Sequence, residues 1–414
     1  MPRRVTVLIV ALWCVCLAIP VQARASDVVT EWNQTALTLT LTAAPALAPV
    51  QQNRAMAIVH VAVHDAINAF TGEYETYRPT APVPSGGTPE AAAIAAAYHA
   101  LKGVFSNQQA SLDAMYAASL IDHHVSAADP GLDVGKAIAD EILALRASDH
   151  ASEAQFDYTV PGAGQVGVWT RLGGAPALLP GWGRVTTWVL HSGAQFRPDA
   201  PPDLTSDTYA KDYNEVQSIG SLTSPIRTTE QTQIALFWRA SPATIWNAVL
   251  TAVLPAQNLD LSSTARAFAL MYLAAADASI ACWDAKYTYN FWRPFPAIVN
   301  GDLDGNPDTA GDSTWRGLLP TPPHPEYPSG HSTNSSAMAH VLERLFDEPS
   351  TPIEVTLSGI TRQWETFEEA IGEVIDARVY SGIHYRTSDE VGARLGRQVA
   401  QFVLTHALKL VRPR

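Results

Sequence analysis

The chain has 414 residues, and its 27 lysines and arginines against 40 acidic residues give a formal net charge of −13. Such an acidic chain repels polyanions, which excludes nucleic acid and anionic membrane surfaces as main partners. Its length and its hydrophobic share of 47% are sufficient to bury a large core.

Residues 1–25 have the pattern of a signal peptide. Arg3 and Arg4 precede an apolar run over residues 5–21, and the Ala-Arg-Ala sequence at 23–25 fits a small-residue cleavage site. The run is short for a membrane-spanning helix, so an uncleaved anchor is the weaker alternative. We therefore expect an exported protein, periplasmic or extracellular, with no membrane span after cleavage.

Cleavage would change the charge and the cysteine content of the chain. It removes three arginines and no acidic residue, which takes the net charge from −13 to −16. It also removes Cys14 and Cys16, so Cys282 is left without a partner for an intrachain disulfide.

Alanine-rich helical patterns dominate the remainder. Residues 54–70 place apolar side chains on one face, and residues 265–287 are apolar enough for a buried helix. Pro- and Gly-rich stretches at 77–89 and 158–183 indicate long surface connections. No alternating strand pattern stands out, so we expect an all-α fold of helical bundles with a site formed by facing helices.

A break near residues 221–229 divides the helical patterns. We expect an N-terminal helical half over residues 26–225 and a catalytic helical half over residues 226–414, packed as parts of one unit rather than as independent domains.

Three segments in the last third of the chain carry seven groups suited to a tetrahedral oxyanion. Arginine offers paired donors, lysine adds a compact charge, and a glycine amide allows close approach. The seven groups are Lys286, Arg293, Ser329, Gly330, His331, Arg378 and His384. Together they predict a site for phosphate or vanadate.

The local pattern around each segment suggests its placement. Lys286 and Arg293 are seven residues apart, so on one helix they would share a face, with Pro294 ending that helix. Residues 329–331 precede a helical pattern and would lie at a helix N-terminus, which favours an anion.

The third segment continues an apolar stripe. Its members recur at helical spacing and are Phe367, Ala370, Ile371, Val374 and Arg378. A guanidinium on a core face needs an anion. Gly382 would then end the helix and place His384 just beyond it.

Each group taken singly has an ordinary interpretation. Arg293 could lie on the surface, PSGH could be a turn with Ser332 or Thr333 as helix cap, and His384 could be a core histidine. Arg378 could pair with a nearby carboxylate, for which the candidates are Glu369, Glu373 and Asp376. The joint occurrence of the three segments favours the oxyanion site.

The motifs K-x6-RP, PSGH and R-x5-H resemble the signature shared by vanadium-dependent haloperoxidases and type 2 phosphatidic acid phosphatases. The segments RTTEQTQIALFW, ACWDAKYTYNFWRP and TPPHPEYPSGHS resemble the bacterial haloperoxidases, and the resemblance extends over nearly all of the mature chain. Ala377 stands where the family usually has serine. Ser388 replaces an aspartate, so orientation of His384 by a carboxylate depends on whether Asp389 reaches it.

The resemblance implies a role for each group. His384 would be the axial ligand of vanadium, and His331 the acid-base residue. The oxygens would be held by the remaining five groups, which are Lys286, Arg293, Ser329, Gly330 and Arg378. The implied cofactor is vanadate, with phosphate able to occupy the same site, and the implied reactants are hydrogen peroxide, halide and, as an open question, a small organic substrate.

Halide choice rests on His324. The resemblance places histidine there in bromoperoxidases and phenylalanine in chloroperoxidases, which favours bromide or iodide. The alternative is a rim residue in a proline-bracketed loop.

Two other functions remain open from the residues alone. An acid phosphatase would use His384 to attack phosphorus and His331 to protonate the leaving group. A non-enzymatic oxyanion-binding protein would need neither histidine.

Two further clusters have structural interpretations. His60 and His64 are spaced like metal ligands but fit core packing, and residues 302–308 resemble a calcium loop but fit a solvated turn near the mouth of the site.

Overall fold

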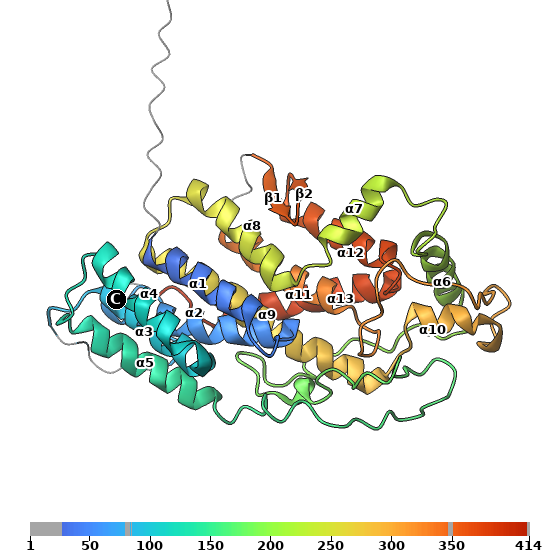
Figure 1. Ribbon diagram of the computed structural model, residues 1–414, viewed down its shortest axis with the longest axis horizontal. Coiled ribbons are helices and arrows are strands. Elements are labelled where there is room, and N and C mark those ends of the chain that lie inside the picture. Colours follow the sequence, from blue (N-terminus) through green and yellow to red (C-terminus); the bar gives the residue numbers. More distant parts are fainter. Residues whose placement is uncertain (1–26, 79–82, 84, 347–350, 412–414) are drawn as a thin grey trace, which may run out of the picture.

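The computed structural model describes residues 27–78, 83, 85–346 and 351–411. The predicted signal peptide lies outside this range. The described chain is predominantly helical, which confirms the all-α prediction (Figure 1).

The first six α-helices belong to the N-terminal half. They are α1 (Val28–Thr42), α2 (Pro49–Thr71), α3 (Pro89–Val104), α4 (Gln109–Asp122), α5 (Gly131–Arg146) and α6 (Asp207–Ile219). The others are α7 (Thr229–Phe237), α8 (Pro242–Gln257), α9 (Leu261–Tyr289), α10 (Pro294–Val299), α11 (Gly330–Leu345), α12 (Phe367–Tyr380) and α13 (Arg386–His406). Short 3-10 turns are η1 (Ser106–Gln108), η2 (Trp182–Arg184) and η3 (Gly301–Leu303).

Helix α9 is the central element of the core. It packs against α2 of the first half and against α11 and α13 of the second. Among the described helices it alone has the length and apolar composition of a membrane span, yet almost all of that stretch is buried by other helices. The prediction of a buried helix over residues 265–287 is therefore confirmed.

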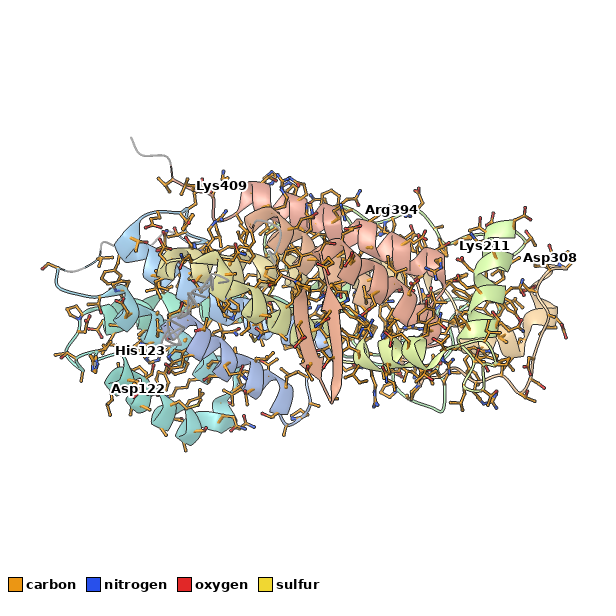
Figure 2. All side chains as sticks on the ribbon, turned by 90° about the horizontal axis from the view of Figure 1, so that it is seen from above. Asp122, His123, Lys211, Asp308, Arg394 and Lys409 are labelled. Atoms are coloured by element: carbon orange, nitrogen blue, oxygen red, sulfur yellow. The ribbon has the colours of Figure 1, made fainter. Side chains whose placement is uncertain are left out.

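The molecule is elongated, with α1–α5 gathered at one end and α6 and α10 at the other (Figure 1). Charged side chains such as Lys211, Asp308 and Arg394 lie at its periphery (Figure 2). The site lies between the two ends, where α9 terminates beside the start of α11. The proposed division at residues 225 and 226 falls in the loop between α6 and α7 and stays a prediction.

Helix α9 ends earlier than the spacing of Lys286 and Arg293 suggested. Asn290 adopts the left-handed conformation at φ 47°, and Arg293 is extended at φ −83° and ψ 157°. Pro294 begins α10 instead of ending α9, because its fixed φ and missing N–H suit the first turn of a helix. The two cations therefore reach the site from different elements.

The structure contains a β-hairpin that the sequence pattern did not predict. Strands β1 (Ile353–Leu357) and β2 (Ile360–Trp364) pair antiparallel around Ser358 and Gly359, both at positive φ. The alternation is present, since Ile353 and Val355 are buried. It spans only five residues per strand, which is too short to stand out in a helical background.

The connection over residues 158–183 is only partly a surface loop. Its tryptophans Trp169 and Trp182 are buried, and Leu178 donates its amide to the carbonyl of Pro323 at 2.9 Å. This loop therefore forms part of the wall of the site. Of the other predicted connection, residues 79–82 and 84 lie outside the described range.

Asp277 holds the segment that follows this loop. The carboxylate is fully buried in α9 and accepts backbone N–H groups of Trp188, Val189 and Leu190 at 2.7 to 2.9 Å. Replacing Asp277 with alanine would leave three backbone donors unpaired, two of them on buried residues.

We expect Asp277→Ala to lower the free energy of unfolding by about 3 kcal/mol or more, since each unpaired buried donor costs roughly 1–3 kcal/mol. Urea denaturation measures the change. Glu153→Ala, on an exposed carboxylate, is the control and should stay within about 0.5 kcal/mol of the wild type. Equal losses in both variants would contradict the assigned role.

Candidate active site

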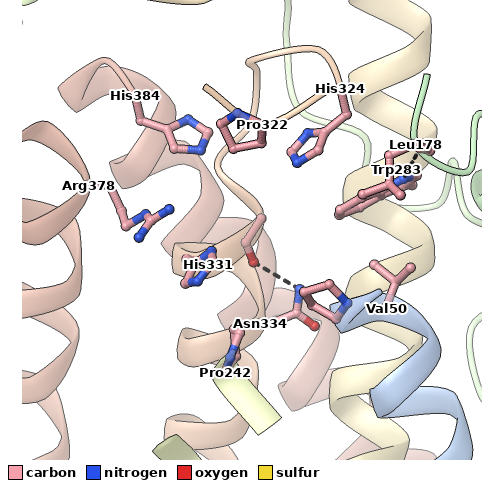
Figure 3. A pocket seen from close by; sticks show the side chains of 12 residues that line it. Val50, Leu178, Pro242, Trp283, Pro322, His324, His331, Asn334, Arg378 and His384 are labelled. Carbon is pink, nitrogen blue, oxygen red and sulfur yellow. Dashed lines mark hydrogen bonds between the residues drawn. The ribbon is translucent and has the colours of Figure 1, made fainter. Parts of the chain in front are cut away.

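A cavity of about 170 Å³ collects side chains from both halves of the chain (Figure 3). Five of the eight predicted site residues line it, namely His324, Gly330, His331, Arg378 and His384. Its remaining walls are mostly apolar and come from Pro49, Val50, Leu178, Pro242, Trp283, Pro322 and Asn334. The predicted groups therefore converge, and the first turn of α2 completes their enclosure.

Lys286 lies fully buried in the last turn of α9. Its Nζ donates to the carbonyl oxygens of Pro325 at 3.0 Å and Glu326 at 2.7 Å. Burial lowers the pKa of Lys286 to about 8. The ammonium thus ties α9 to the loop that precedes α11.

Arg293 is also fully buried and donates in several directions. Its Nε bonds the carbonyl of His324 at 3.0 Å, and its Nη1 bonds the carbonyl of Ile383 at 2.8 Å. The same Nη1 lies 3.1 Å from His384 Nε2. Burial lowers the pKa of Arg293 to about 10. The interpretation of Arg293 as a surface residue is wrong.

Arg378 extends from the buried face of α12 into the cavity. Its Nη1 donates to the carbonyl of Trp238 at 2.9 Å, while its buried Nε has no partner. None of the candidate carboxylates pairs with it. Glu373 binds Arg362, Asp376 binds Arg386, and Glu369 accepts the backbone N–H of Glu365.

The three cations are therefore all buried without forming an ion pair. Among the ion pairs of the described chain, none involves Lys286, Arg293 or Arg378. Buried charges without counter-charges are costly. Most of their hydrogen-bond partners are backbone carbonyls, and the buried carboxylates of Glu326 and Asp389 act on them only through space, so the arrangement suits a bound anion.

The PSGH segment lies at the start of α11, as predicted. Ser329 is the N-cap residue and is fully buried; neither Ser332 nor Thr333 takes that position. A Cβ on Gly330 would come within 3.3 Å of Trp283 Cζ3. Glycine at this position therefore allows the start of α11 to lie close to the Trp283 ring.

His331 faces the cavity from the first turn of α11. Its Nε2 lies 3.2 Å from the carbonyl of Ala240, which can only accept, so the proton is on Nε2 and the lone pair on Nδ1. Burial, followed by the charge of Arg378, holds the pKa of His331 well below its usual range. A neutral imidazole with a free lone pair is suited to accept a proton.

His384 follows the break at Gly382, where φ is 73°. Its Nδ1 lies 2.7 Å from Oε1 of Glu326, which is fully buried. Asp389 does not reach it. Asp389 instead accepts the hydroxyl of Ser332 at 2.7 Å. Burial raises the pKa of Glu326 to about 7, although Arg293 and Lys286 oppose that shift.

Glu326 was missed in the sequence. Its signal was a carboxylate between prolines in HPEYPSGH, three residues before Ser329, but the contact with His384 spans 58 positions. Local spacing says nothing about such a contact.

His324 is buried in the cavity wall and is not a rim residue. Its exposed fraction is 8%, and its ring centroid lies 5.0 Å from that of Trp283. Its Nδ1 accepts from Arg293 Nη2 at 2.9 Å. The structure places it in the cavity wall beside Arg293, and its role in halide choice stays a prediction.

Neither of the other two clusters gathers three side chains that could hold a metal ion within the described residues. His60 bonds Asn33 at 3.1 Å and stacks on Phe268 and Tyr272, as core packing predicts. In the loop over residues 302–308, Asp304 and Asn306 are buried, so the turn is less solvated than expected.

Comparison with known proteins identifies relatives of this chain. The family model described as the VCPO second helical-bundle domain matches residues 266–413. The vanadium chloroperoxidase of Curvularia inaequalis is 24% identical over 86% of this chain and 78% of its own length.

Solved structures agree in fold. A bacterial vanadium-dependent iodoperoxidase superposes with a TM-score of 0.79 at 26% identity, covering 94% of this chain and 97% of its own. A bacterial vanadium-dependent chloroperoxidase in its apo form gives 0.67 at 18% identity, covering 86% and 94%.

Arg293→Lys tests the anion site. Lysine keeps the charge but loses the planar donor set. Because one charge-assisted hydrogen bond is worth roughly 1.5–3 kcal/mol, we expect affinity for inorganic phosphate to fall by about tenfold or more. Calorimetric titration measures it, with Arg397→Lys on the exposed face of α13 as control. Unchanged affinity in Arg293→Lys would contradict the site.

Proposed function

We propose that the chain is a vanadate-dependent haloperoxidase that oxidises halide with hydrogen peroxide to hypohalous acid, and its similarity to vanadium haloperoxidases supports this proposal. One observation carries the proposal. Within the described chain, three buried cations form no ion pair with a carboxylate, and they lie around a cavity that Arg378, His331 and His384 line, with Arg293 hydrogen-bonded to His384 behind its wall. A multiply charged tetrahedral oxyanion would offset these charges and satisfy their donors.

The residues fit vanadate. The unpartnered Nε of Arg378 is a donor that the protein itself leaves free. The Gly330 amide is accessible because no Cβ covers it, and Ser329 adds a hydroxyl at the same helix start. His384 would supply the nitrogen ligand through Nε2, and Lys286, Arg293 and Arg378 would hold the oxygens.

The protein's own contribution is charge, orientation and proton transfer. When bound, vanadate would supply a Lewis acid for the reaction of peroxide with halide. His331 is positioned to take a proton on Nδ1, since Nε2 is held at the Ala240 carbonyl. The apolar walls contributed by α2, α8 and Trp283 limit access of water to the cations.

Bromide or iodide is the proposed halide. His324 supports this choice because it lies in the cavity wall, at the position where the resemblance has histidine in bromoperoxidases and phenylalanine in chloroperoxidases. The similar bacterial proteins include an iodoperoxidase and a chloroperoxidase, and the relative from Curvularia inaequalis is a chloroperoxidase, so relatives alone leave the halide open.

Turnover tests the function. With vanadate added after metal stripping, we expect peroxide-dependent oxidation of iodide and bromide, faster than that of chloride. His331→Ala should retain vanadate binding but lose about 10²–10⁴-fold in rate, as expected for a lost acid-base group. Hydrolysis of p-nitrophenyl phosphate by vanadate-free protein, without halide oxidation under any condition, would instead indicate the phosphatase.

We also propose that the protein is exported, on the sequence of residues 1–25 alone. N-terminal sequencing of the protein recovered from a producing cell should begin close to Ser26. A mature chain that starts at Met1 and stays in the cytoplasmic fraction would contradict export.

A further inference from the structure

We propose that Glu326 is a positioning residue of this site, whose carboxylate fixes His384 with its proton on Nδ1 and its lone pair on Nε2, on the side of Arg293. The tautomer of His384 follows from contacts within the protein and does not depend on a bound ligand. The expected effect of Glu326 on vanadate affinity rests on the proposed function.

One side of the imidazole is fixed by an acceptor. Glu326 Oε1 lies 2.7 Å from His384 Nδ1 and also accepts the backbone N–H of Tyr385 at 3.1 Å. The amide can only donate, so this oxygen is held as an acceptor. Nδ1 must then carry the proton.

The other side is fixed by a donor. Arg293 Nη1 lies 3.1 Å from His384 Nε2, and a guanidinium has no acceptor. Nε2 therefore presents a lone pair. The two contacts are independent, and they select the same tautomer, which is the one that can bind phosphorus or a metal through Nε2.

Glu326 also joins the three motif segments. Its backbone carbonyl accepts from Lys286, and its backbone N–H donates to the carbonyl of Phe291 at 2.9 Å. Its side chain holds His384. A change in this residue would therefore disturb the distance between the cation of the first segment and the imidazole of the third.

Asp389 is the competing candidate, since the family resemblance points to that part of the chain. Its Oδ1 is bound to Ser332, three residues after Ser329. The two buried carboxylates thus have separate tasks. Glu326 orients the imidazole, and Asp389 holds a hydroxyl beneath the start of α11.

Nuclear magnetic resonance of ¹⁵N-histidine-labelled, vanadate-free protein at pH 8 tests the tautomer, with His384→Gln identifying the resonance. We expect a protonated Nδ1 with slow proton exchange in the wild type and in Asp389→Asn. In Glu326→Ala the slowly exchanging proton should be lost. A proton on Nε2 in the wild type, or loss of the signal in Asp389→Asn instead, would overturn the assignment.

Vanadate affinity, measured by calorimetry without peroxide, tests the consequence. Loss of a group that orients a metal ligand typically costs 10–100-fold, which we expect for Glu326→Ala. Glu326→Gln keeps an acceptor for Nδ1 and should lose less. Glu343→Gln, on the exposed side of α11, is the control and should match the wild type.

Binding by Glu326→Ala within twofold of the wild type would overturn the positioning role. If the alanine variant fails to fold, Glu326→Gln must still weaken binding relative to the Glu343→Gln control, and equal affinities would overturn the role. If the wild type shows no vanadate-dependent turnover, the proposed function is wrong. The resonance measurement of the His384 Nδ1 proton would still test whether Glu326 positions this imidazole.

Discussion

The structure of the site depends on one constraint, the burial of three cations without carboxylate partners. Lys286, Arg293 and Arg378 have almost no contact with solvent. Burial lowers the pKa of each, because the charged form loses its hydration. A bound anion would offset this electrostatic penalty, which is why the arrangement supports an oxyanion site.

Backbone carbonyls provide the compensation that the fold itself supplies. They come from Trp238 after α7, from the loop over residues 324–326 and from Ile383 after α12. Each of these segments is irregular, so its carbonyls are not used within a helix. The ends of helices and the loops between them therefore create the site, and the long helix α9 serves as their rigid support.

Much of the site could be predicted from sequence because the chemistry is local to each segment. Gly330 at a helix start, Arg378 on an apolar stripe and Gly382 as a helix end all follow from short-range rules. The shared helix of Lys286 and Arg293 was wrong because Asn290 and Pro294 override the spacing. The role of residues 158–183 and of Glu326 was missed, since both depend on contacts between segments far apart in sequence.

A crystal structure of the protein soaked with orthovanadate would test the central claim most directly. The account predicts vanadium bonded to His384 Nε2, with its oxygens contacted by Lys286, Arg293 and Arg378. Vanadate bound elsewhere, or a cavity that takes up no oxyanion while the three cations keep only their carbonyl partners, would contradict it.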